Sequence, residues 1–198
     1  FEQKILKENV GSQDQVAATY GGFNQIVFTK KNKINLKKID VSKKRLEELN
    51  SNLMLFYSGM SRNSDNNAKK IIKGIEKNTK TLFEMRNNVE EAKKILISRS
   101  NINLFGKLLH ESWQQKKQLA NTMSNQRINE IYSVAMDNGA IGGKILGSGN
   151  GGFILLYVPI KFQKKLKNKF YKLLHVPFNF ENQGTKIIFN GLNSEKKR

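Results

Sequence analysis

A helical pattern that runs almost unbroken from Asp65 to Met136 limits the folds open to this sequence, because short apolar runs of strand type stand on both sides of it. The run NLMLFYSG precedes the helical region, and two further runs, over 141–146 and 152–158, follow it. This order predicts an α+β fold in which an antiparallel sheet is backed by several long helices.

Capping and helix-breaking residues divide the chain into its remaining elements. Helix breaks are expected near Thr79, Ser100-Asn101 and Ser124-Asn125, and Ser12 and Ser42 are typical N-caps. The further elements expected are the end of a helix over 1–9, helices over 13–20, 42–49 and 160–174, and strands in FNQIVFTK, in KINLKKIDV and over 176–180 and 185–189.

Composition excludes several kinds of site. The 198-residue chain has no cysteine, which excludes disulfides and thiolate metal sites, and its two histidines are too few for a histidine-built zinc site. It has no run of eighteen apolar residues that could span a membrane, and its first residues are not those of a signal peptide. We therefore expect a cytoplasmic protein with no metal site in this chain and no membrane partner.

The excess of basic residues raises the alternative of a nucleic-acid-binding domain. There are 35 Lys and Arg against 16 Asp and Glu, a formal charge of +19. Only six of these 35 residues are arginine, whereas proteins that bind nucleic-acid grooves and phosphates favour arginine over lysine. The lysines are spread over nearly every segment, often beside apolar residues at helical spacing, as on solvated helix faces. We therefore expect no nucleic-acid partner.

The stretch GGKILGSGNGGFILLY, residues 142–157, contains a glycine-rich loop between two apolar runs. Glycine permits positive φ and close approach of the backbone to a ligand, so this loop could turn several N–H groups toward one anion. A tight hairpin would use the same residues. The spacing matches neither the P-loop nor the dinucleotide-binding motif, so spacing alone leaves both interpretations open.

Two other stretches carry polar residues suited to chemistry. Asp14, in GSQDQVAATYGGFN, follows a glycine break near a helix N-terminus and could accept a proton from a substrate hydroxyl, or be an ordinary first-turn aspartate. Arg62, in FYSGMSRNSDN, could bind a phosphate, but the neighbouring Ser61 and Ser64 are equally typical of a plain turn.

A third stretch, LLHESWQQKKQLANTMSNQRINEIY, places Lys116 and Lys117 near the point where one helix gives way to the next. Its apolar residues form a core stripe at helical spacing, and we expect Trp113 to belong to that core. We expect His110 to be a packed or capping histidine and not a ligand.

Five blocks of the sequence, taken together, resemble the GHMP kinases, and within that family most of all the D-glycero-D-manno-heptose 7-phosphate kinases. The blocks fall in the family's order over residues 8–158; they are GSQDQVAATYGGFN, FYSGMSRNS, FGKLLHESWQQKK, MSNQRINEIY and NGAIGGKILGSGNGGF. The resemblance implies a GHMP-kinase-like fold, with residues 1–42 as the remainder of the N-terminal, ATP-binding catalytic domain and 43–198 as the C-terminal domain.

The glycine-rich loop is the part that resembles the family's third motif. It reads GSGNGG where the family has GAGGGG, and asparagine tolerates the left-handed region better than other non-glycine residues. The implied activity is transfer of the γ-phosphoryl group of ATP to the anomeric hydroxyl of a sugar phosphate, with Asp14 orienting or deprotonating that hydroxyl. The implied phosphate-proximal residues are Gly147, Ser148, Gly149, Asn150, Gly151 and Gly152; the implied substrate-binding residues are Gly22, Ser61, Arg62, Lys116 and Lys117.

The family's first motif and its P-x-x-x-G-L-G-S-S-type ATP loop have no counterpart in this sequence. By the same resemblance, the ligands of Mg²⁺ belong with those missing parts. We therefore expect the C-terminal portion of a kinase that uses ATP and Mg²⁺, inactive by itself. Two alternatives stay open, a catalytically inactive remnant that binds sugar phosphate or a partner, and the basic nucleic-acid-binding domain. The sequence indicates no oligomeric state.

Overall fold

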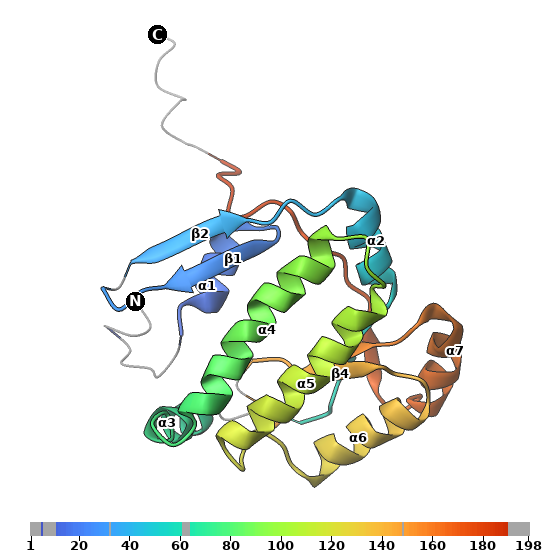
Figure 1. Ribbon diagram of the computed structural model, residues 1–198. Coiled ribbons are helices and arrows are strands. Elements are labelled where there is room, and N and C mark those ends of the chain that lie inside the picture. Colours follow the sequence, from blue (N-terminus) through green and yellow to red (C-terminus); the bar gives the residue numbers. More distant parts are fainter. Residues whose placement is uncertain (1–4, 6–10, 32, 61–63, 148, 190–198) are drawn as a thin grey trace. The chain divides into compact units, whose positions relative to one another are not determined.

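The computed structural model describes residues 5, 11–31, 33–60, 64–147 and 149–189 (Figure 1). The chain divides into two compact units. The larger contains Val41–Asn179, and the smaller contains Gly11–Asp40 together with the segment that begins at Phe180. We describe each unit by itself.

The larger unit contains a four-stranded antiparallel sheet in the order β4-β5-β3-β6. In the central pairs, Leu55 lies opposite both Leu155 and Val176. The strands are β3 (Leu53–Tyr57), β4 (Gly142–Ile145), β5 (Phe153–Tyr157) and β6 (Leu174–Val176). This sheet and its covering helices confirm the predicted α+β fold.

The helices of the larger unit begin and end close to where the sequence predicts, except for the C-terminal end of α7. They are α2 (Lys43–Ser51), α3 (Ser64–Lys73), α4 (Thr79–Ile97), α5 (Asn103–Leu119), α6 (Gln126–Asp137) and α7 (Ile160–Lys169). Ser42 caps α2 as predicted, since its Oγ accepts from the N–H of Arg45 at 3.3 Å. In the part of the chain that the structure describes, none of these helices is long and apolar enough to cross a bilayer.

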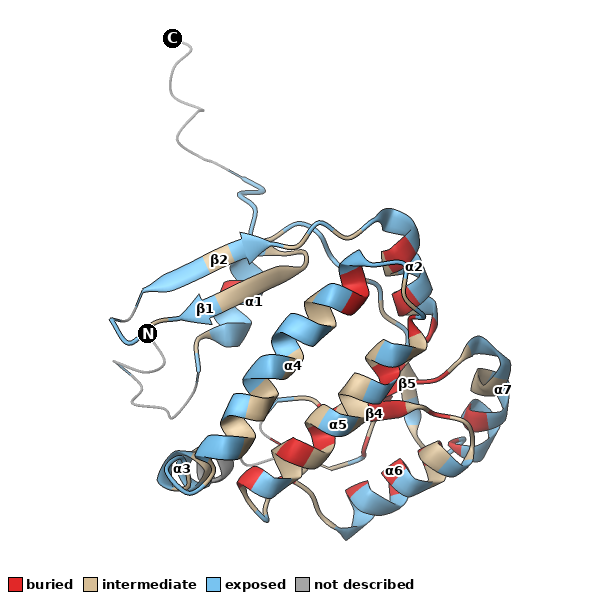
Figure 2. Ribbon diagram, in the orientation of Figure 1, coloured by how far each residue is buried: buried red, intermediate tan, exposed pale blue. Residues whose placement is uncertain are grey.

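Alternate residues of the two inner strands form the core of this unit. Met54 and Phe56 of β3, with Ile154 and Leu156 of β5, are each at most 1% exposed. They cluster with Trp113 of α5, which is fully buried, so the prediction that Trp113 is a core residue is confirmed. Figure 2 shows buried positions in α5, α6, β4 and β5, and also in α2.

Helix α5 approaches β4 closely because two glycines meet there. A Cβ on Gly142 would fall onto the carbonyl oxygen of Gly106, and a Cβ on Gly106 would lie 2.6 Å from the ring of Tyr157. Tyr157 is buried, and its hydroxyl donates to Asn103 Oδ1 at 3.0 Å. The missing side chains of Gly106 and Gly142 therefore set the spacing between α5 and the sheet.

The smaller unit consists of a short helix, a β-hairpin and a returning segment. Its elements are α1 (Gln13–Tyr20), β1 (Asn24–Phe28) and β2 (Ile34–Lys38), and the two strands pair antiparallel with Ile26 opposite Leu36. After Phe180 the chain returns to the end of α1, where the N–H of Thr185 donates to the carbonyl of Thr19 at 3.0 Å.

The hydrophobic content of the smaller unit is mostly outside. Val16 is buried, whereas Val27, Phe28 and Ile34 of the hairpin are 47–50% exposed. A two-stranded hairpin is marginally stable by itself. The hairpin therefore exposes apolar surface that the rest of this unit does not cover.

The prediction of two closing strands is wrong. The first, expected over 176–180, is displaced to the three-residue strand β6, which ends before Pro177, a residue without the N–H that a ladder needs. The second, over 185–189, does not form, and Ile187, Ile188 and Phe189 there are more than 80% exposed. The basic helix, expected to 174, ends at Lys169. The helix end expected over 1–9 falls on residues outside the described ranges, apart from residue 5.

We predict that Gly142→Ala lowers the free energy of unfolding by about 1–3 kcal/mol, because the new methyl group must push α5 away from β4. Chemical denaturation monitored by the fluorescence of Trp113 measures the change. Gly11→Ala is the matched control, since a Cβ there would meet nothing within 4 Å. Equal stability of the two variants would show that the α5–β4 spacing is not fixed by this glycine.

We also predict a loss of stability in strong alkali. Burial raises the pKa of Tyr132 and, with the Glu48 carboxylate adding to the effect, that of Tyr157 to about 12. An unfolded tyrosine ionises near pH 10, so the stabilisation is present below about pH 10 and lost as the pH rises through about 12. The slope of unfolding free energy against pH should be shallower in Tyr157→Phe than in the wild type; an equal slope would contradict the shift.

Candidate functional site

The glycine-rich loop connects β4 to β5 at one end of the sheet. Gly147, Gly149 and Gly152 have φ of +69°, +89° and +81°, a region that side chains rarely enter. Asn150 has φ of +62° and therefore lies in the left-handed region, which asparagine was expected to tolerate. Ser148 lies outside the described residues. The loop therefore needs both its glycines and its asparagine.

Neighbouring segments hold this loop by hydrogen bonds. The N–H of Asn150 donates to the carbonyl of Met123 at 3.0 Å, in the connection between α5 and α6. The N–H of Gly152 donates to the carbonyl of Met60 at 3.0 Å, and the N–H of Ser58 donates to the carbonyl of Gly152 at 2.9 Å. The loop is thus pinned on two sides, by the α5–α6 connection and by the chain that leaves β3.

Asn125 binds the loop and begins a helix with the same side chain. Its Oδ1 accepts from the N–H of Ile128 at 3.0 Å and so caps α6. Its Nδ2 lies 2.8 Å from Asn150 Oδ1 and 3.3 Å from the carbonyl oxygen of Asn150, and donates to both. A Cβ on Gly149 would lie 2.8 Å from the carbonyl oxygen of Met123, so only glycine fits against this connection.

Among the described residues of the loop, two that are buried have an N–H group without an acceptor. Within the part of the chain that the structure describes, the N–H groups of Gly149 and Gly151 have no acceptor, although both residues are buried. Buried N–H groups without a partner are rare in folded proteins. N–H groups in a loop of mostly positive φ are donors of the kind that bind anions in proteins.

The structure separates the two lysines singled out in the sequence. Lys116 Nζ donates to the carbonyl of Gly147 at 2.5 Å and so reaches the loop from the last turn of α5. Lys117 Nζ lies over the ring of Trp113, 5.9 Å from its centroid. Neighbouring residues of a helix point about 100° apart, so the two cannot serve one site equally.

The remaining predicted residues fall in the smaller unit or outside the described ranges. Asp14 is exposed in the first turn of α1, and Ser12 at its N-cap makes no side-chain cap bond. Gly22 has φ of +69°, and its N–H donates to the carbonyl of Glu181 at 2.9 Å. Ser61 and Arg62 are not among the described residues, and their roles stay predictions.

Sequence reasoning did not give Asn125 and Ser58 a role at the loop. Asn125 stood at an expected helix break, and asparagine there is a signal for an N-cap, but its contact with Asn150 spans 25 residues. Ser58 ends a strand, and its buried Oγ has no partner within the described part of the chain. Both residues lie in blocks that resemble the GHMP kinases, but the blocks alone did not show that their side chains are near the loop.

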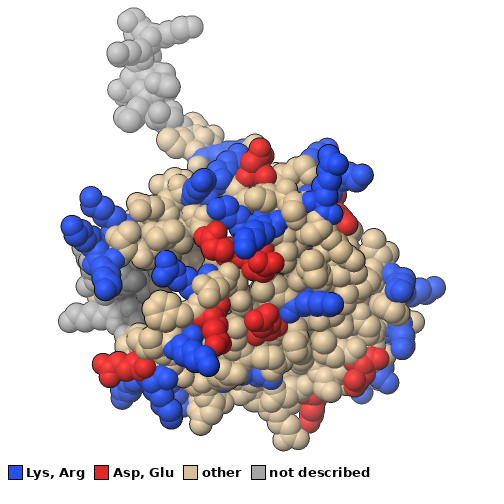
Figure 3. Space-filling view, viewed as in Figure 1, with Lys and Arg blue, Asp and Glu red and all other residues tan. Residues whose placement is uncertain are grey.

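His110 is a packed histidine, as predicted. Its Nδ1 lies 2.8 Å from the hydroxyl of Tyr132, against whose ring it stacks. Among the residues that the structure describes, no group of three histidines and carboxylates could hold a metal ion. On the face that carries α4 and α5, basic and acidic side chains are mixed (Figure 3), and Glu91 and Lys94 form an ion pair at 3.6 Å.

The chain has relatives among known sugar kinases. The sequence profile of the GHMP kinase C-terminal domain matches residues 88–172. A D-glycero-α-D-manno-heptose 7-phosphate kinase of Campylobacter jejuni is 30% identical over 180 residues, which are 89% of this chain and 53% of that protein. The chain thus spans about half the length of that relative.

Solved structures share the fold. The crystal structure of a candidate sugar kinase from Campylobacter jejuni is 26% identical, with a TM-score of 0.65 over 93% of this chain and 53% of that one. A D-glycero-D-manno-heptose 1-phosphate kinase from Bacteroides thetaiotaomicron is 22% identical, with a TM-score of 0.63 over 95% of this chain and 53% of that one. The second likeness concerns the fold alone.

We predict that the two functions of Asn125 can be separated by substitution. Asn125→Ala removes the cap and the loop contacts, and should lower the free energy of unfolding by about 1–2 kcal/mol. Asn125→Asp keeps a capping oxygen but cannot donate to Asn150, so it should retain more stability than the alanine variant. Both should speed hydrogen exchange at the N–H of Asn150. Asn138→Ala, at the other end of α6, is the control; unchanged loop exchange in Asn125→Asp would contradict the assignment.

Proposed function

Because residues 88–172 match the GHMP kinase C-terminal domain, we propose that this chain belongs to that family and forms the C-terminal half of an ATP-dependent sugar kinase. The acceptor that we propose is the anomeric hydroxyl of a sugar phosphate. D-glycero-D-manno-heptose 7-phosphate is the first candidate, because of the 30% identity to the Campylobacter jejuni enzyme of that name. The observation that carries the proposal is the glycine loop, held on two sides, in which the buried residues Gly149 and Gly151 have N–H groups with no acceptor within the described residues.

The loop supplies fixed donors for phosphate oxygens. Phosphoryl transfer depends on positioning and on stabilising charge that spreads over the transferring group. Donors that are already in place do this without reorganisation at the moment of reaction. The N–H groups of Gly149 and Gly151 are such donors. Those of Asn150 and Gly152 already donate to the carbonyls of Met123 and Met60. This division of donors and anchors favours a phosphate cradle over a plain hairpin.

Asp14 is the base that we propose. The sugar hydroxyl gives its proton to the carboxylate, its oxygen forms a bond to the γ-phosphorus, and the bond from that phosphorus to the bridging oxygen of ADP breaks. The exposed position of Asp14 in the first turn of α1 leaves its carboxylate accessible to a substrate.

The substrate phosphate needs a cation, and the two lysines are not equal candidates. We propose that Lys116 anchors the loop through Gly147, since its Nζ is already engaged there. Arg62, with Ser61, remains our proposal for the distal phosphate of the sugar. Gly22 and Lys117 are proposed only as neighbours of that substrate.

We propose that ATP and Mg²⁺ are bound mainly by the part of a kinase that this sequence lacks. No group of carboxylates among the described residues fits Mg²⁺, and no GLGSS-type loop occurs in the chain. When bound, Mg²⁺ would neutralise charge on the phosphates of ATP. The half-exposed apolar residues of the hairpin support a further segment that completes the smaller unit. The alternative, an inactive chain that binds sugar phosphate, is favoured by the same missing loop.

The experiment compares the chain by itself with a fusion in which the N-terminal half of the Campylobacter jejuni relative precedes it. We expect ADP release that depends on heptose 7-phosphate from the fusion, and none from the chain alone. Transfer by the chain alone would contradict the incomplete site. A folded fusion that binds heptose 7-phosphate without turnover would favour the inactive alternative.

We predict that Asp14→Asn in the fusion lowers kcat by about 10²–10⁴-fold and leaves KM nearly unchanged, because the amide keeps the shape but cannot take a proton. Asp40→Asn is the matched control, since Asp40 is the other exposed aspartate of the smaller unit. A loss below about tenfold, equivalent to about 1.4 kcal/mol, would make Asp14 a structural residue.

A further inference from the structure

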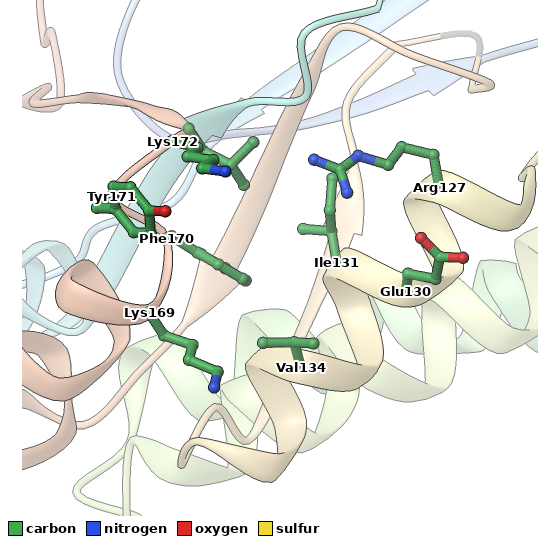
Figure 4. Close-up of a pocket in the computed structure, with 9 residues that line it drawn as sticks. Arg127, Glu130, Ile131, Val134, Lys169, Phe170, Tyr171 and Lys172 are labelled. Atoms are coloured by element: carbon green, nitrogen blue, oxygen red, sulfur yellow. The ribbon is translucent and has the colours of Figure 1, made fainter.

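A cavity of about 300 Å³ lies in the larger unit between α6 and the turn that follows α7 (Figure 4). Its lining from α6 includes Arg127, Ile131 and Val134, and its lining from the α7 side includes Lys169 and Phe170. None of these residues belongs to the glycine loop or to its anchors. The cavity therefore needs an explanation of its own.

Positive charge surrounds this cavity. Figure 4 shows the side chains of Arg127 and Lys172 on opposite sides of its upper part, and Lys169 below them. Within the described part of the chain, none of the three forms an ion pair; Lys172 Nζ lies 5.5 Å from the centroid of the Tyr171 ring. Glu130 is the one carboxylate in the lining, and it accepts from Gln126 Nε2 at 2.9 Å. Three cations and one anion leave an excess of positive charge.

The floor between these charges is apolar. Ile131 and Phe170 are 3% and 6% exposed, and Val134 and Leu173 are half-buried beside them. Tyr171, 76% exposed, stands at the rim. Flat apolar groups pack well on such aromatic and branched side chains, and their charged ends can reach the cations around them.

The volume restricts the occupant to a small molecule. About 300 Å³ is at the lower limit of small-molecule pockets, too little for a peptide helix laid in a groove. We propose that this cavity binds a small organic anion with a flat apolar body, an aromatic carboxylate or sulfonate being the simplest form. The apolar floor holds the body, and Arg127, Lys169 and Lys172 hold the anionic group. This site is independent of the proposed kinase activity.

The test uses the whole chain and two dyes that differ by one charged group. We expect 8-anilinonaphthalene-1-sulfonate to saturate one site per chain, with NMR shift changes at Ile131, Val134 and Phe170. N-phenyl-1-naphthylamine, which lacks the sulfonate, should bind more weakly. Added salt should weaken the sulfonate and not the neutral dye, since salt screens exposed charges.

The variant Arg127→Gln/Lys172→Gln should weaken binding of the sulfonate about tenfold and leave the neutral dye unchanged. Lys164→Gln/Lys165→Gln removes the same charge from exposed positions of α7 outside the lining, and should have no effect. Circular dichroism verifies that both variants are folded. Equal binding of the sulfonate to both variants, shift changes elsewhere, or tighter binding of a tetraglutamate peptide than of the sulfonate would overturn the proposal.

Discussion

The hydrogen bonds between the α5–α6 connection and the glycine loop are the contacts on which the rest of the site depends. Asn150 reaches Met123 through its backbone, and Asn125 reaches Asn150 through its side chain. Because Asn125 also caps α6, the start of that helix and the shape of the loop are fixed together. The loop can therefore present Gly149 and Gly151 in one conformation, which a free hairpin could not do.

Local signals made much of the fold predictable. Helix breaks followed from capping residues such as Ser42, and strands such as β3 followed from short apolar runs. The closing strands could not be predicted, because 185–189 has the composition of a strand but no partner strand, and the segment after Phe180 bonds to Thr19 and Gly22 instead. Strand formation depends on a neighbour that local composition does not reveal.

The features of the site also differ in whether local sequence or distant contacts determine them. The positive φ of Asn150 could be expected from its residue type within a glycine run. The choice between Lys116 and Lys117 could not, since it depends on how α5 is rotated against the loop. The roles of Asp14 and Arg62 came from resemblance to a family, and they stay predictions.

The two units differ in how completely they bury their apolar residues. The larger has a core around Trp113, whereas the hairpin of the smaller leaves Phe28 half exposed. The chain spans about half the length of its Campylobacter jejuni relative, and it contains one well-packed unit and one sparsely packed unit. The proposal that the glycine loop binds phosphate is tested most directly by the turnover per folded molecule of Gly149→Ala, measured in the fusion with the relative's N-terminal half. Gly139→Ala, which has the same sign of φ and is crowded by Phe162, is its control. Our account predicts that Gly149→Ala loses turnover beyond its loss of folding and that the control does not; wild-type turnover among folded Gly149→Ala molecules would contradict it.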